Sequence, residues 1–386
     1  PVEPVDYAVI GGGVVGLTIA RELARRHPRA RIAVLEKEAH LGEHASGRNS
    51  GVLHAGFYYA PDSLKAWLTA RGNQLLRAFC AEHDVRVRSC GKVVVASTPE
   101  QLPALDELVR RGTANGVRLE TVDERGLADL EPLARTVDRA IWSPDTGVAD
   151  PKAVTAALQA DLLARGVQIL TSTPVTAPPD AGHIVNAAGL YADRVAQWFG
   201  FCDDYVMMPF KGLYWYGNER APRLQRHVYP VPDPRNPFLG VHFTVTPGGG
   251  VKVGPTAIPV LSREAYSWAF RGDEAREVAT SFPAFLRGGH HDVPALIRAE
   301  VPKYSRRYLV RQARALVPTA DGFTVRGRPG IRAQLMHKAS GRLEMDFVVR
   351  GDERSTHVLN AVSPAWTASL AFAELVVDGM AERGAA

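Results

Sequence analysis

The sequence predicts a mixed α/β fold, in which a domain of alternating strands and helices carries an inserted domain with a mainly antiparallel sheet. Residues 7–26 have the pattern of an apolar strand, a glycine turn and a helix, and residues 145–170 return to the rhythm of helix and strand. From about residue 205 to residue 318 the chain changes to aromatic strands punctuated by proline, such as FKGLYWYG and FLGVHFTV. With 386 residues, 46% of them hydrophobic, the chain is long enough for two domains.

The first strand and helix are joined by a glycine motif of the dinucleotide-binding type. In IGGGVVGL, Gly11 permits a tight turn, Gly13 lets a pyrophosphate approach the backbone, and Gly16 lets helix and strand pack closely. The N-terminus of the helix would then hold the phosphates. A second strand, RIAVLEKE, ends at Glu36, at the spacing from Gly16 where an acidic side chain meets a ribose hydroxyl. The alternative is a glycine-rich turn in another kind of α/β protein.

Later segments extend this domain and interrupt it twice. A helix is expected from about Ser63, and another with Asp150 as its N-cap and Pro151 at its first position. In HIVNAAGLYADRVA a buried strand runs into small residues and then a helix, and the C-terminal segment again shows strand, tight loop and helix. We therefore expect a discontinuous cofactor-binding domain and a substrate-binding domain. The predicted boundaries are 1–88, 146–204 and 319–386 for the first domain, and 89–145 and 205–318 for the second.

Composition argues against several other classes of function. The net charge of +5 comes from arginines spread along the chain, so no nucleic-acid partner is expected. Cys80, Cys90 and Cys202 lie far apart, which indicates free thiols in a reducing compartment. No metal site is expected, because His290 and His291 read as a loop and no ligand cluster has metal-type spacing. No apolar run reaches the ~18 residues of a membrane span, so we expect a cytoplasmic protein, with peripheral membrane contact left open.

Several glycine-rich or tight loops indicate FAD rather than NAD. The glycine motif fits both cofactors, but an extended FAD needs distant segments to line it, and GRNSG, NAAG and NAVSPAWT are candidates. Together with VLEKE, GRNSGVLHAGFYY, CGKVVVA, DTGVAD, PFKGLYW, VYPVPDPRNPFLGVHFT and GIRAQ, these stretches resemble the FAD-dependent L-2-hydroxyglutarate dehydrogenase/oxidase family, within the D-amino-acid oxidase and glycine oxidase superfamily. The resemblance covers almost the whole chain. It implies a Rossmann-like FAD-binding domain of the glutathione-reductase type with an inserted substrate domain.

The motifs and the resemblance together imply a set of residues around a non-covalently bound FAD. They are Gly11, Gly13, Val15, Gly16, Glu36, Lys37, Arg48, Asn49, Ser50, Gly51, Val52, Val175, Ala187, Ala188, Gly189, Gly330, Ser363, Pro364, Ala365, Trp366 and Thr367.

His54 is the candidate for the base that such chemistry requires. Oxidation of a 2-hydroxy acid needs a hydride acceptor, a base for the hydroxyl proton and cations for the carboxylate. An imidazole has an unperturbed pKa of about 6.5, so small shifts bring it to working pH. The resemblance also implies that His54 lies beside the flavin. The alternative is a histidine that only donates a hydrogen bond to the cofactor or to a buried carbonyl. Tyr58 and Tyr59 are expected as pocket walls or hydroxyl donors, with one of the pair in the core.

Lys211, His242, Lys252 and Arg332 are the candidates for binding the carboxylate. If VHFTVTPGGGVKVGP is a hairpin that turns near Gly248, Val245 pairs with Val251 and Phe243 with Val253. His242, Thr244 and Lys252 then share the other face, which is either a wall of the site or a solvated surface. The resemblance places Arg332 near flavin and substrate, and a surface arginine is the alternative.

These features predict an FAD enzyme that oxidises an L-2-hydroxy acid, similar to L-2-hydroxyglutarate, and passes electrons to oxygen or a quinone-type acceptor. The alternative is a specialised flavin oxidase or oxygenase for an aromatic amino, hydroxy or oxo acid, motivated by Trp215 and Trp366. A flavin-binding scaffold without turnover is the third reading. A serine hydrolase is not expected, because there is no Gly-x-Ser-x-Gly motif.

Overall fold

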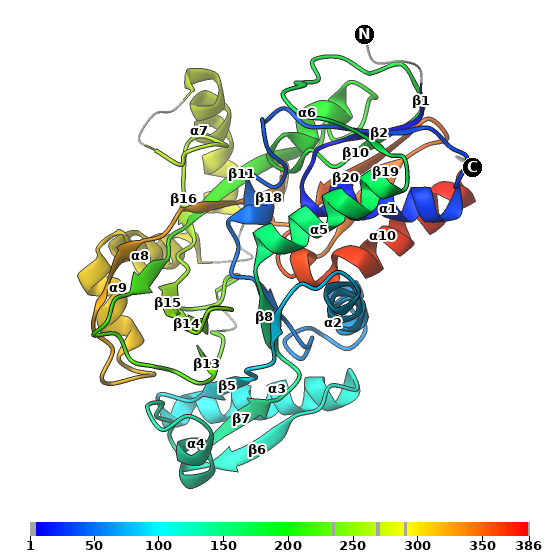
Figure 1. Ribbon diagram of the computed structural model, residues 1–386. Coiled ribbons are helices and arrows are strands. Elements are labelled where there is room, and N and C mark those ends of the chain that lie inside the picture. The colour runs from blue at the N-terminus through cyan, green and yellow to red at the C-terminus, as the bar shows by residue number, and fades with distance from the viewer. Residues whose placement is uncertain (1–4, 234–235, 268–270, 289–291, 385–386) are drawn as a thin grey trace.

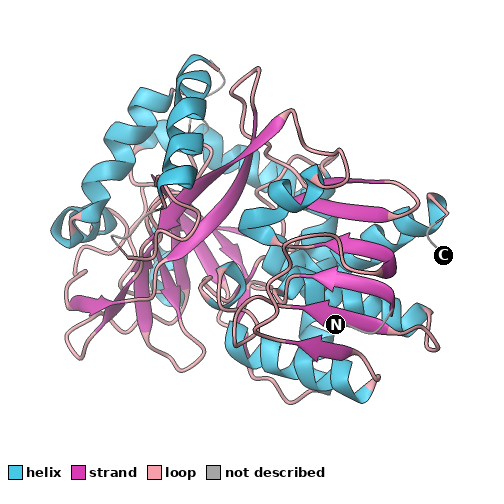
Figure 2. Cartoon of the chain, turned by 90° about the horizontal axis from the view of Figure 1, so that it is seen from above, coloured by secondary structure: helices cyan, strands magenta, loops and turns pink. Residues whose placement is uncertain are grey.

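The computed structural model describes residues 5–233, 236–267, 271–288 and 292–384, and the expected loop at His290 and His291 lies outside these ranges. Within them, a six-stranded and an eight-stranded sheet form the two sides of the molecule (Figures 1 and 2). Two three-stranded sheets lie between them. The first strand, β1 (Val5–Ile10), and the last helix, α10 (Ala365–Glu382), both belong to the side with the six-stranded sheet (Figure 1). The predicted combination of a Rossmann-like domain with a mainly antiparallel one is confirmed.

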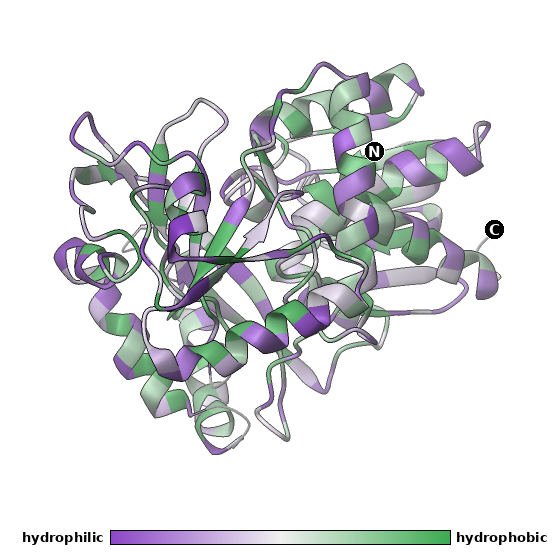
Figure 3. Ribbon diagram, turned by 90° about the horizontal axis from the view of Figure 1, so that it is seen from below, coloured by the Kyte–Doolittle hydropathy of each residue, from purple (hydrophilic) through white to green (hydrophobic). Residues whose placement is uncertain are grey.

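The six-stranded sheet is parallel except for one edge strand. Its order is β19 (Val348–Gly351), β20 (Ser355–Asn360), β10 (Ala181–Asn186), β1 (Val5–Ile10), β2 (Ile32–Leu35) and β9 (Gln168–Leu170), with β19 antiparallel. Four helices pack together on one side, namely α1 (Val14–Arg26), α2 (Leu64–Glu82), α5 (Pro151–Ala164) and α10 (Ala365–Glu382). Their apolar side chains form one core with the sheet, and α10 is buried over most of its length. Helices with exposed sides alternate between apolar and polar residues along their length (Figure 3).

The predicted starts of two of these helices are confirmed. The Ser63 hydroxyl accepts a hydrogen bond from the Ala66 amide at 3.2 Å, as an N-cap does. The Asp150 carboxylate caps α5 in the same way, accepting from the Lys152 amide at 2.9 Å, and Pro151 occupies the first helical position.

The eight-stranded sheet is antiparallel except where β13 runs parallel to β5. Its order is β17 (Phe323–Arg326), β12 (Trp215–Gly217), β15 (Val251–Gly254), β14 (His242–Val245), β13 (His227–Pro230), β5 (Lys92–Val95), β7 (Arg139–Ser143) and β6 (Glu120–Asp123). The predicted hairpin register is confirmed, because Val245 pairs with Val251 and Phe243 with Val253. These side chains belong to an apolar core that also includes Leu309.

The smaller elements connect the two sides. The three-stranded sheets are β16 (Ile258–Pro259), β11 (Tyr205–Gly212) and β18 (Gly330–His337), and β3 (Val52–Leu53), β8 (Gly147–Ala149) and β4 (Val87–Arg88). Short helices complete the connections, namely α3 (Leu102–Ala114), α4 (Glu124–Leu130), α6 (Ala192–Gln197), η1 (Ala45–Gly47), η2 (Pro99–Gln101), η3 (Gly189–Tyr191) and η4 (Val301–Tyr304).

The description of residues 205–318 as strands was wrong beyond Pro259. This part contains α7 (Gly272–Arg287), α8 (Val293–Glu300) and α9 (Arg306–Ala313). They lie beside the three-stranded sheet of β16, β11 and β18 and beside the eight-stranded sheet (Figure 1). Proline suggested strands and loops, but Pro294 lies in the first turn of α8, where no intrahelical amide bond is lost. The predicted boundary at residue 319 also needs correction, since β17 pairs with β12 in the eight-stranded sheet. The remaining domain boundaries stay a prediction.

Cys80, Cys90 and Cys202 are buried and free, as the sequence predicts. Within the described ranges, every helix is too short or too polar to cross a membrane.

Candidate active site

A cavity of about 750 Å³ begins at the glycine turn after β1 and extends to β18 and the loop around His54. This volume is typical of a site for a cofactor or a small ligand. Most of the predicted site residues line it, namely Gly11, Gly13, Val15, Glu36, Lys37, Arg48, Asn49, Ser50, Val52, His54, Val175, Ala187, Ala188, Gly189, Gly330, Arg332, Ser363, Pro364, Ala365, Trp366 and Thr367. Gly16, Gly51, Tyr59, Lys211 and His242 are not among the lining residues.

The glycine turn brings three backbone segments into close contact. Gly11 has a φ of +111°, and a Cβ there would lie 2.4 Å from the carbonyl oxygen of Ala187. A Cβ at Gly16 would lie 2.0 Å from the Gly11 carbonyl oxygen, so Gly16 packs the helix on the turn instead of lining the cavity. The N-cap residue Gly13 has no side chain, the Ser46 hydroxyl accepts from the Val14 amide at 2.8 Å, and the first turn of α1 carries no acidic residue. The helix N-terminus is therefore suited to an anionic ligand.

Glu36 presents a fixed carboxylate at the end of β2. One oxygen accepts a hydrogen bond from the Gly12 amide at 2.7 Å, and the other accepts from the Glu38 amide at 2.8 Å. These bonds hold the carboxylate beside the glycine turn while each oxygen retains a further lone pair. The arrangement fits a ribose hydroxyl, and the turn, helix and acid together fit the adenosine diphosphate part of FAD.

The loop from Arg48 to His54 is held from several sides. The Arg48 guanidinium donates to the carbonyl oxygens of Glu43, at 2.6 Å, and Pro329, at 3.2 Å. Gly51 donates its amide to Asn49, and a Cβ at Gly51 would lie 2.2 Å from the Ala149 carbonyl oxygen. Gly51 therefore fixes the loop through this close contact with the Ala149 backbone instead of lining the cavity.

Thr367 joins the same loop to the start of α10. Its hydroxyl donates to the Val52 carbonyl at 3.0 Å and accepts from the His54 amide at 3.2 Å. The Asn73 side chain donates to the His54 carbonyl at 2.9 Å. The backbone of His54 is thus fixed by residues from two helices.

The imidazole of His54 is less constrained than its backbone. Its Nδ1 is buried and has no hydrogen-bond partner in the described chain. Burial, and then the positive charges of Lys92, His242 and His227, hold the pKa of His54 well below its usual value. The ring is therefore neutral at pH 7 and can accept a proton. Its role as a base, or as a hydrogen-bond partner of the cofactor, stays a prediction.

His227 shows what a structural histidine looks like in the same region. Its Nδ1 accepts from the Val245 amide at 3.0 Å, and its Nε2 lies 3.2 Å from the Cys90 sulfur. Both ring nitrogens are occupied by the protein, in contrast to His54.

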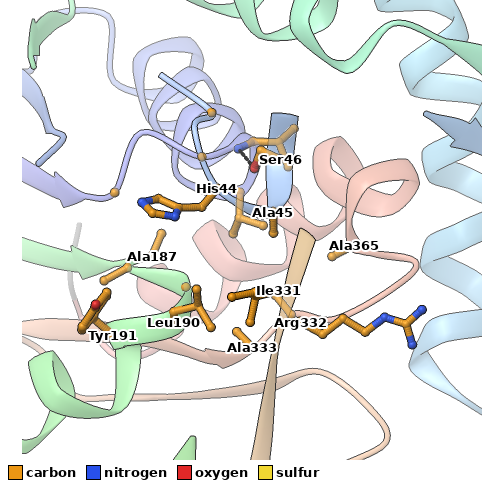
Figure 4. Close-up of a pocket in the computed structure, with 18 of the residues that line it drawn as sticks. His44, Ala45, Ser46, Ala187, Leu190, Tyr191, Ile331, Arg332, Ala333 and Ala365 are labelled. Carbon is orange, nitrogen blue, oxygen red and sulfur yellow. Dashed lines mark hydrogen bonds between the residues drawn. The ribbon is translucent and has the colours of Figure 1, made fainter. Parts of the chain in front are cut away.

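Arg332 is a cation that lines the cavity at the end formed by β18 and the His54 loop. Its side chain extends from β18 away from His44 and Tyr191 (Figure 4). The guanidinium makes no ion pair with any described residue, and its carbon lies 5.0 Å from the centre of the Phe238 ring. Burial lowers the pKa of Arg332, although Tyr214 and Glu300 oppose this effect. A guanidinium pairs strongly with a carboxylate that can approach it through the cavity.

His242 and Lys252 lie on one face of the eight-stranded sheet, as the hairpin register predicts, and this face is buried rather than solvated. The His242 ring stacks on Tyr229 with 3.8 Å between centroids, and its Nδ1 donates to the Gly240 carbonyl at 2.8 Å. Burial lowers the pKa of His242 to about 3. Lys252 donates to the Ser50 carbonyl at 3.1 Å, which brings this face against the cofactor loop.

The other two candidates lie away from the cavity walls. Lys211 sits on β11, where burial and then the charge of Arg326 lower its pKa. Tyr59 lies near Asp346 and Lys65, and burial raises the pKa of its phenol.

Sequence reasoning missed Lys92, the most enclosed of the cations in this region. It is fully buried on β5 and pairs in register with His227 of β13. The signal was present in GKVVVA, where a lysine opens an otherwise apolar strand that is buried along its whole length. Tyr214, which lines the cavity beside Arg332, was also missed.

The two tryptophans that motivated an aromatic substrate are placed differently. Trp366 lines the cavity at the start of α10 and also packs in the main core. Trp215 packs against the apolar core of the eight-stranded sheet and is not among the residues that line the cavity. Only one of the two therefore lines the cavity.

Among the described residues, one group has the composition of a metal site, namely Glu38, His44 and Glu264. The Lys37 ammonium already donates to Glu264 at 2.6 Å and also bonds to Glu38. A lysine therefore supplies the positive charge that these carboxylates require.

Comparison with known proteins gives a consistent result. The profile of a family described as FAD dependent oxidoreductase matches residues 6–379. The mitochondrial L-2-hydroxyglutarate dehydrogenase of Nematostella vectensis is 37% identical over 99% of this chain and 92% of its own length. The L-2-hydroxyglutarate dehydrogenase of Indibacter alkaliphilus is 35% identical over 97% of this chain and 98% of its own. Among solved structures, the FAD-bound L-alpha-glycerophosphate oxidase of Mycoplasma pneumoniae superimposes with a TM-score of 0.79 at 22% identity, covering 98% of this chain and 95% of its own.

Proposed function

Since the chain belongs to the FAD-dependent oxidoreductases, in the family of the L-2-hydroxyglutarate dehydrogenases, we propose that it oxidises L-2-hydroxyglutarate to 2-oxoglutarate. The observation that carries the proposal is the match to the Indibacter relative, which spans 97% of this chain and 98% of that protein. Because the match leaves no large part of either protein uncovered, cofactor-binding and substrate-binding segments are both included.

FAD fits the cavity from the glycine turn to the loop at His54. Gly11, Gly13 and the N-terminus of α1 would hold the pyrophosphate, and Glu36 the adenine-side ribose. When bound, FAD supplies an acceptor for the two electrons and the C2 hydrogen of a hydroxy acid. The segments around Ser50, Gly330 and Pro364 would surround the flavin.

The substrate would bind between Arg332 and His54. Arg332 forms no ion pair with a described residue and would bind the carboxylate beside the reacting carbon. His54 would accept the hydroxyl proton at its free Nδ1. Oxidation then releases that proton to the imidazole, and C2 becomes the carbonyl carbon of the oxo acid.

The cations around His54 make its basicity depend on the substrate. Burial, and then the charge of Lys92, lower the pKa of His54, so the free enzyme holds the imidazole neutral. A bound dianion offsets this positive potential and would raise the pKa of His54 towards the working pH. The base would therefore become stronger when the substrate is present.

The electron acceptor and the cellular location remain predictions. We propose oxygen or a quinone-type compound as the acceptor and a cytoplasmic location with room for peripheral membrane contact. The alternative activity on an aromatic acid is not favoured, because Trp215 packs in the sheet core.

Anaerobic mixing of the purified flavoprotein with L-2-hydroxyglutarate tests the proposal. We expect loss of the oxidised flavin absorbance together with an equal amount of 2-oxoglutarate. D-2-hydroxyglutarate is the matched control, because it has the same charges and the opposite configuration at C2. Reduction by aromatic acids but not by L-2-hydroxyglutarate would contradict the proposal and support the specialised alternative.

A further inference from the structure

Lys92 lies in a box of aromatic rings next to the candidate active site. Its Nζ is 4.1 Å from the centre of the Tyr229 ring, 4.9 Å from that of Tyr58 and 5.4 Å from that of Phe57. The side chain has no solvent exposure, and its Nζ has no hydrogen-bond partner within the described chain.

An ammonium buried in this way lacks the hydrogen-bond acceptors and the opposite charge that would stabilise it. Three N–H donors need acceptors, and aromatic faces compensate only part of the cost of removing a charge from water. No carboxylate in the described structure forms an ion pair with Lys92, and the neighbouring Cys90 thiol is the only group whose charge opposes the effect of burial on its pKa. The pKa of Lys92 falls to about 7 for this reason.

The other buried cations of this region are better compensated. Lys252 donates to the Ser50 carbonyl and feels the charge of Asp150. Lys65 feels the charge of Asp346. Lys92 is therefore the lysine of this group with the greatest need for an external anion.

Its position connects it to the reacting centre. Phe57 and Tyr58, two rings of the box, follow His54 by three and four residues in the same loop, and the charge of Lys92 adds to the effect of burial on the pKa of His54. The Tyr229 ring contacts both Lys92 and His242, because the Lys92 Nζ lies 4.1 Å from its centre and the His242 ring stacks on it at 3.8 Å. The hydroxyl of Tyr58, in the same aromatic box, is also buried and without a hydrogen-bond partner in the described chain.

We propose that Lys92, with the Tyr58 hydroxyl beside it, binds the second carboxylate of a dicarboxylate substrate, while Arg332 binds the carboxylate at the reacting carbon. This inference rests on the proposed function and names the feature that would select a dicarboxylic over a monocarboxylic hydroxy acid. Arg332 lines the cavity and Lys92 lies outside its lining, so the two cations occupy different places and can bind different carboxylates of one substrate. The aromatic walls exclude water, so the ion pair formed there is strong and a neutral substrate end is disfavoured.

Equilibrium binding of glutarate and valerate to the oxidised holoenzyme tests the inference without turnover. Both acids have five carbons, and only glutarate carries a second carboxylate. Each would be titrated while the flavin spectrum is followed, in the wild type and in Lys92→Met, which retains a long apolar side chain. We expect the Kd of glutarate to rise about 30-fold or more in Lys92→Met and that of valerate to change less than about 3-fold. Lys338→Met, on the exposed turn after β18, is the control and should change neither.

Kinetics provide the second measurement. The KM of L-2-hydroxyglutarate should rise with the Kd of glutarate, whereas kcat/KM for L-2-hydroxyvalerate should change little. If Lys92→Met loses its FAD, Tyr58→Phe replaces it, because this change removes the hydroxyl and keeps the ring. We expect that variant to weaken glutarate about 5-fold and valerate much less.

The outcomes separate the inference from the function on which it rests. Equal losses for glutarate and valerate, or no loss for either, in Lys92→Met would overturn the role of Lys92 even if L-2-hydroxyglutarate reduces the wild-type flavin. If L-2-hydroxyglutarate does not reduce the wild-type flavin but Lys92→Met weakens glutarate selectively, the proposed function fails and the dicarboxylate site stands.

Discussion

The two ends of the cavity differ in how their polar groups are paired. At the glycine turn, both oxygens of Glu36 accept backbone hydrogen bonds, and the Ser46 hydroxyl accepts from the Val14 amide. At the other end, His54 Nδ1 and Trp366 Nε1 are buried without partners in the described chain, and so are the Tyr58 hydroxyl and Lys92 Nζ, which lie outside the cavity lining. The first end is rigid before any ligand binds, and the second has groups that a ligand must satisfy.

The ends also differ in their origin in the chain. The glycine turn, Glu36 and the Ala187 loop follow three neighbouring parallel strands, whose carboxyl ends meet at one edge of the sheet. Lys92 comes from β5, more than a hundred residues before β13 and β14, which carry His227, Tyr229 and His242 on the same face of the eight-stranded sheet. In the proposed roles, cofactor binding therefore depends on local turns, and substrate recognition on the register between β5 and β13.

Loss of the glycine turn should have the largest effect. Gly11→Ala places a Cβ 2.4 Å from the Ala187 carbonyl at a φ of +111°, so we expect flavin content to fall to about a tenth or less, measured by flavin absorbance per protein. Gly166→Ala is the matched control, because Gly166 has a φ of +79° and open space around it. Retention of full flavin in Gly11→Ala would break the assignment of this end to the cofactor.

Removal of the His54 imidazole should impair the substrate end of the cavity and leave the cofactor end intact. His54→Ala should keep its flavin but lose about 10²-fold or more of the rate of substrate-driven flavin reduction, measured by anaerobic stopped flow. If the rate is unchanged, His54 is only a hydrogen-bond partner at the flavin and another group takes the proton.

Acid should destabilise the cationic end through its neutral histidines. The pKa of His242 falls from 6.5 to about 3 on folding because of burial, and the charges of Lys92, Arg332 and Lys252 add to the effect. Between these values the unfolded chain binds a proton that the folded protein does not, so this contribution to stability is lost as the pH falls below 6.5.

His242→Gln should remove part of this dependence. At pH 5 the wild type should lose about 2 kcal/mol relative to pH 8 through this one residue, and the variant should be correspondingly less sensitive to acid. Urea unfolding at the two pH values measures the difference. Parallel curves for wild type and variant would show that His242 is protonated in the folded protein.

Trp215 should have the smallest effect on substrate choice. Trp215→Phe keeps an apolar ring against the core of the eight-stranded sheet and removes an indole N–H that has no partner among the described residues. We expect the same relative rates with aliphatic and aromatic hydroxy acids as in the wild type, from flavin reduction with a panel of acids. A changed preference would show that β12 also takes part in substrate recognition.

The cofactor end could be predicted almost completely from the sequence. Gly11, Gly13, Glu36, Ala187 and Pro364 line the cavity as expected, because each belongs to a short motif whose spacing fixes its geometry. The hairpin at Gly248 was predictable for the same reason, since its two strands are adjacent in the chain.

The substrate end could be predicted only in part. His54 and Arg332 were found through motifs, whereas Lys92 was missed and Lys211 is not among the residues that line the cavity. Helix α8 was missed because proline was interpreted as a strand or loop signal, although Pro294 lies in its first turn, where proline is compatible with a helix. Helix α7 contains Pro283 in its interior.

The sequence by itself determined the Rossmann-like turn, the FAD-binding family and the His54 loop, because these depend on residues a few positions apart whose backbone geometry is set locally. Only the tertiary structure decided which lysine is left without a partner. The pairing of β5 with β13, and of β13 with β14, aligns Lys92, Tyr229 and His242 on one buried face. That alignment depends on strand register and on the exclusion of water from the face, which no local spacing encodes.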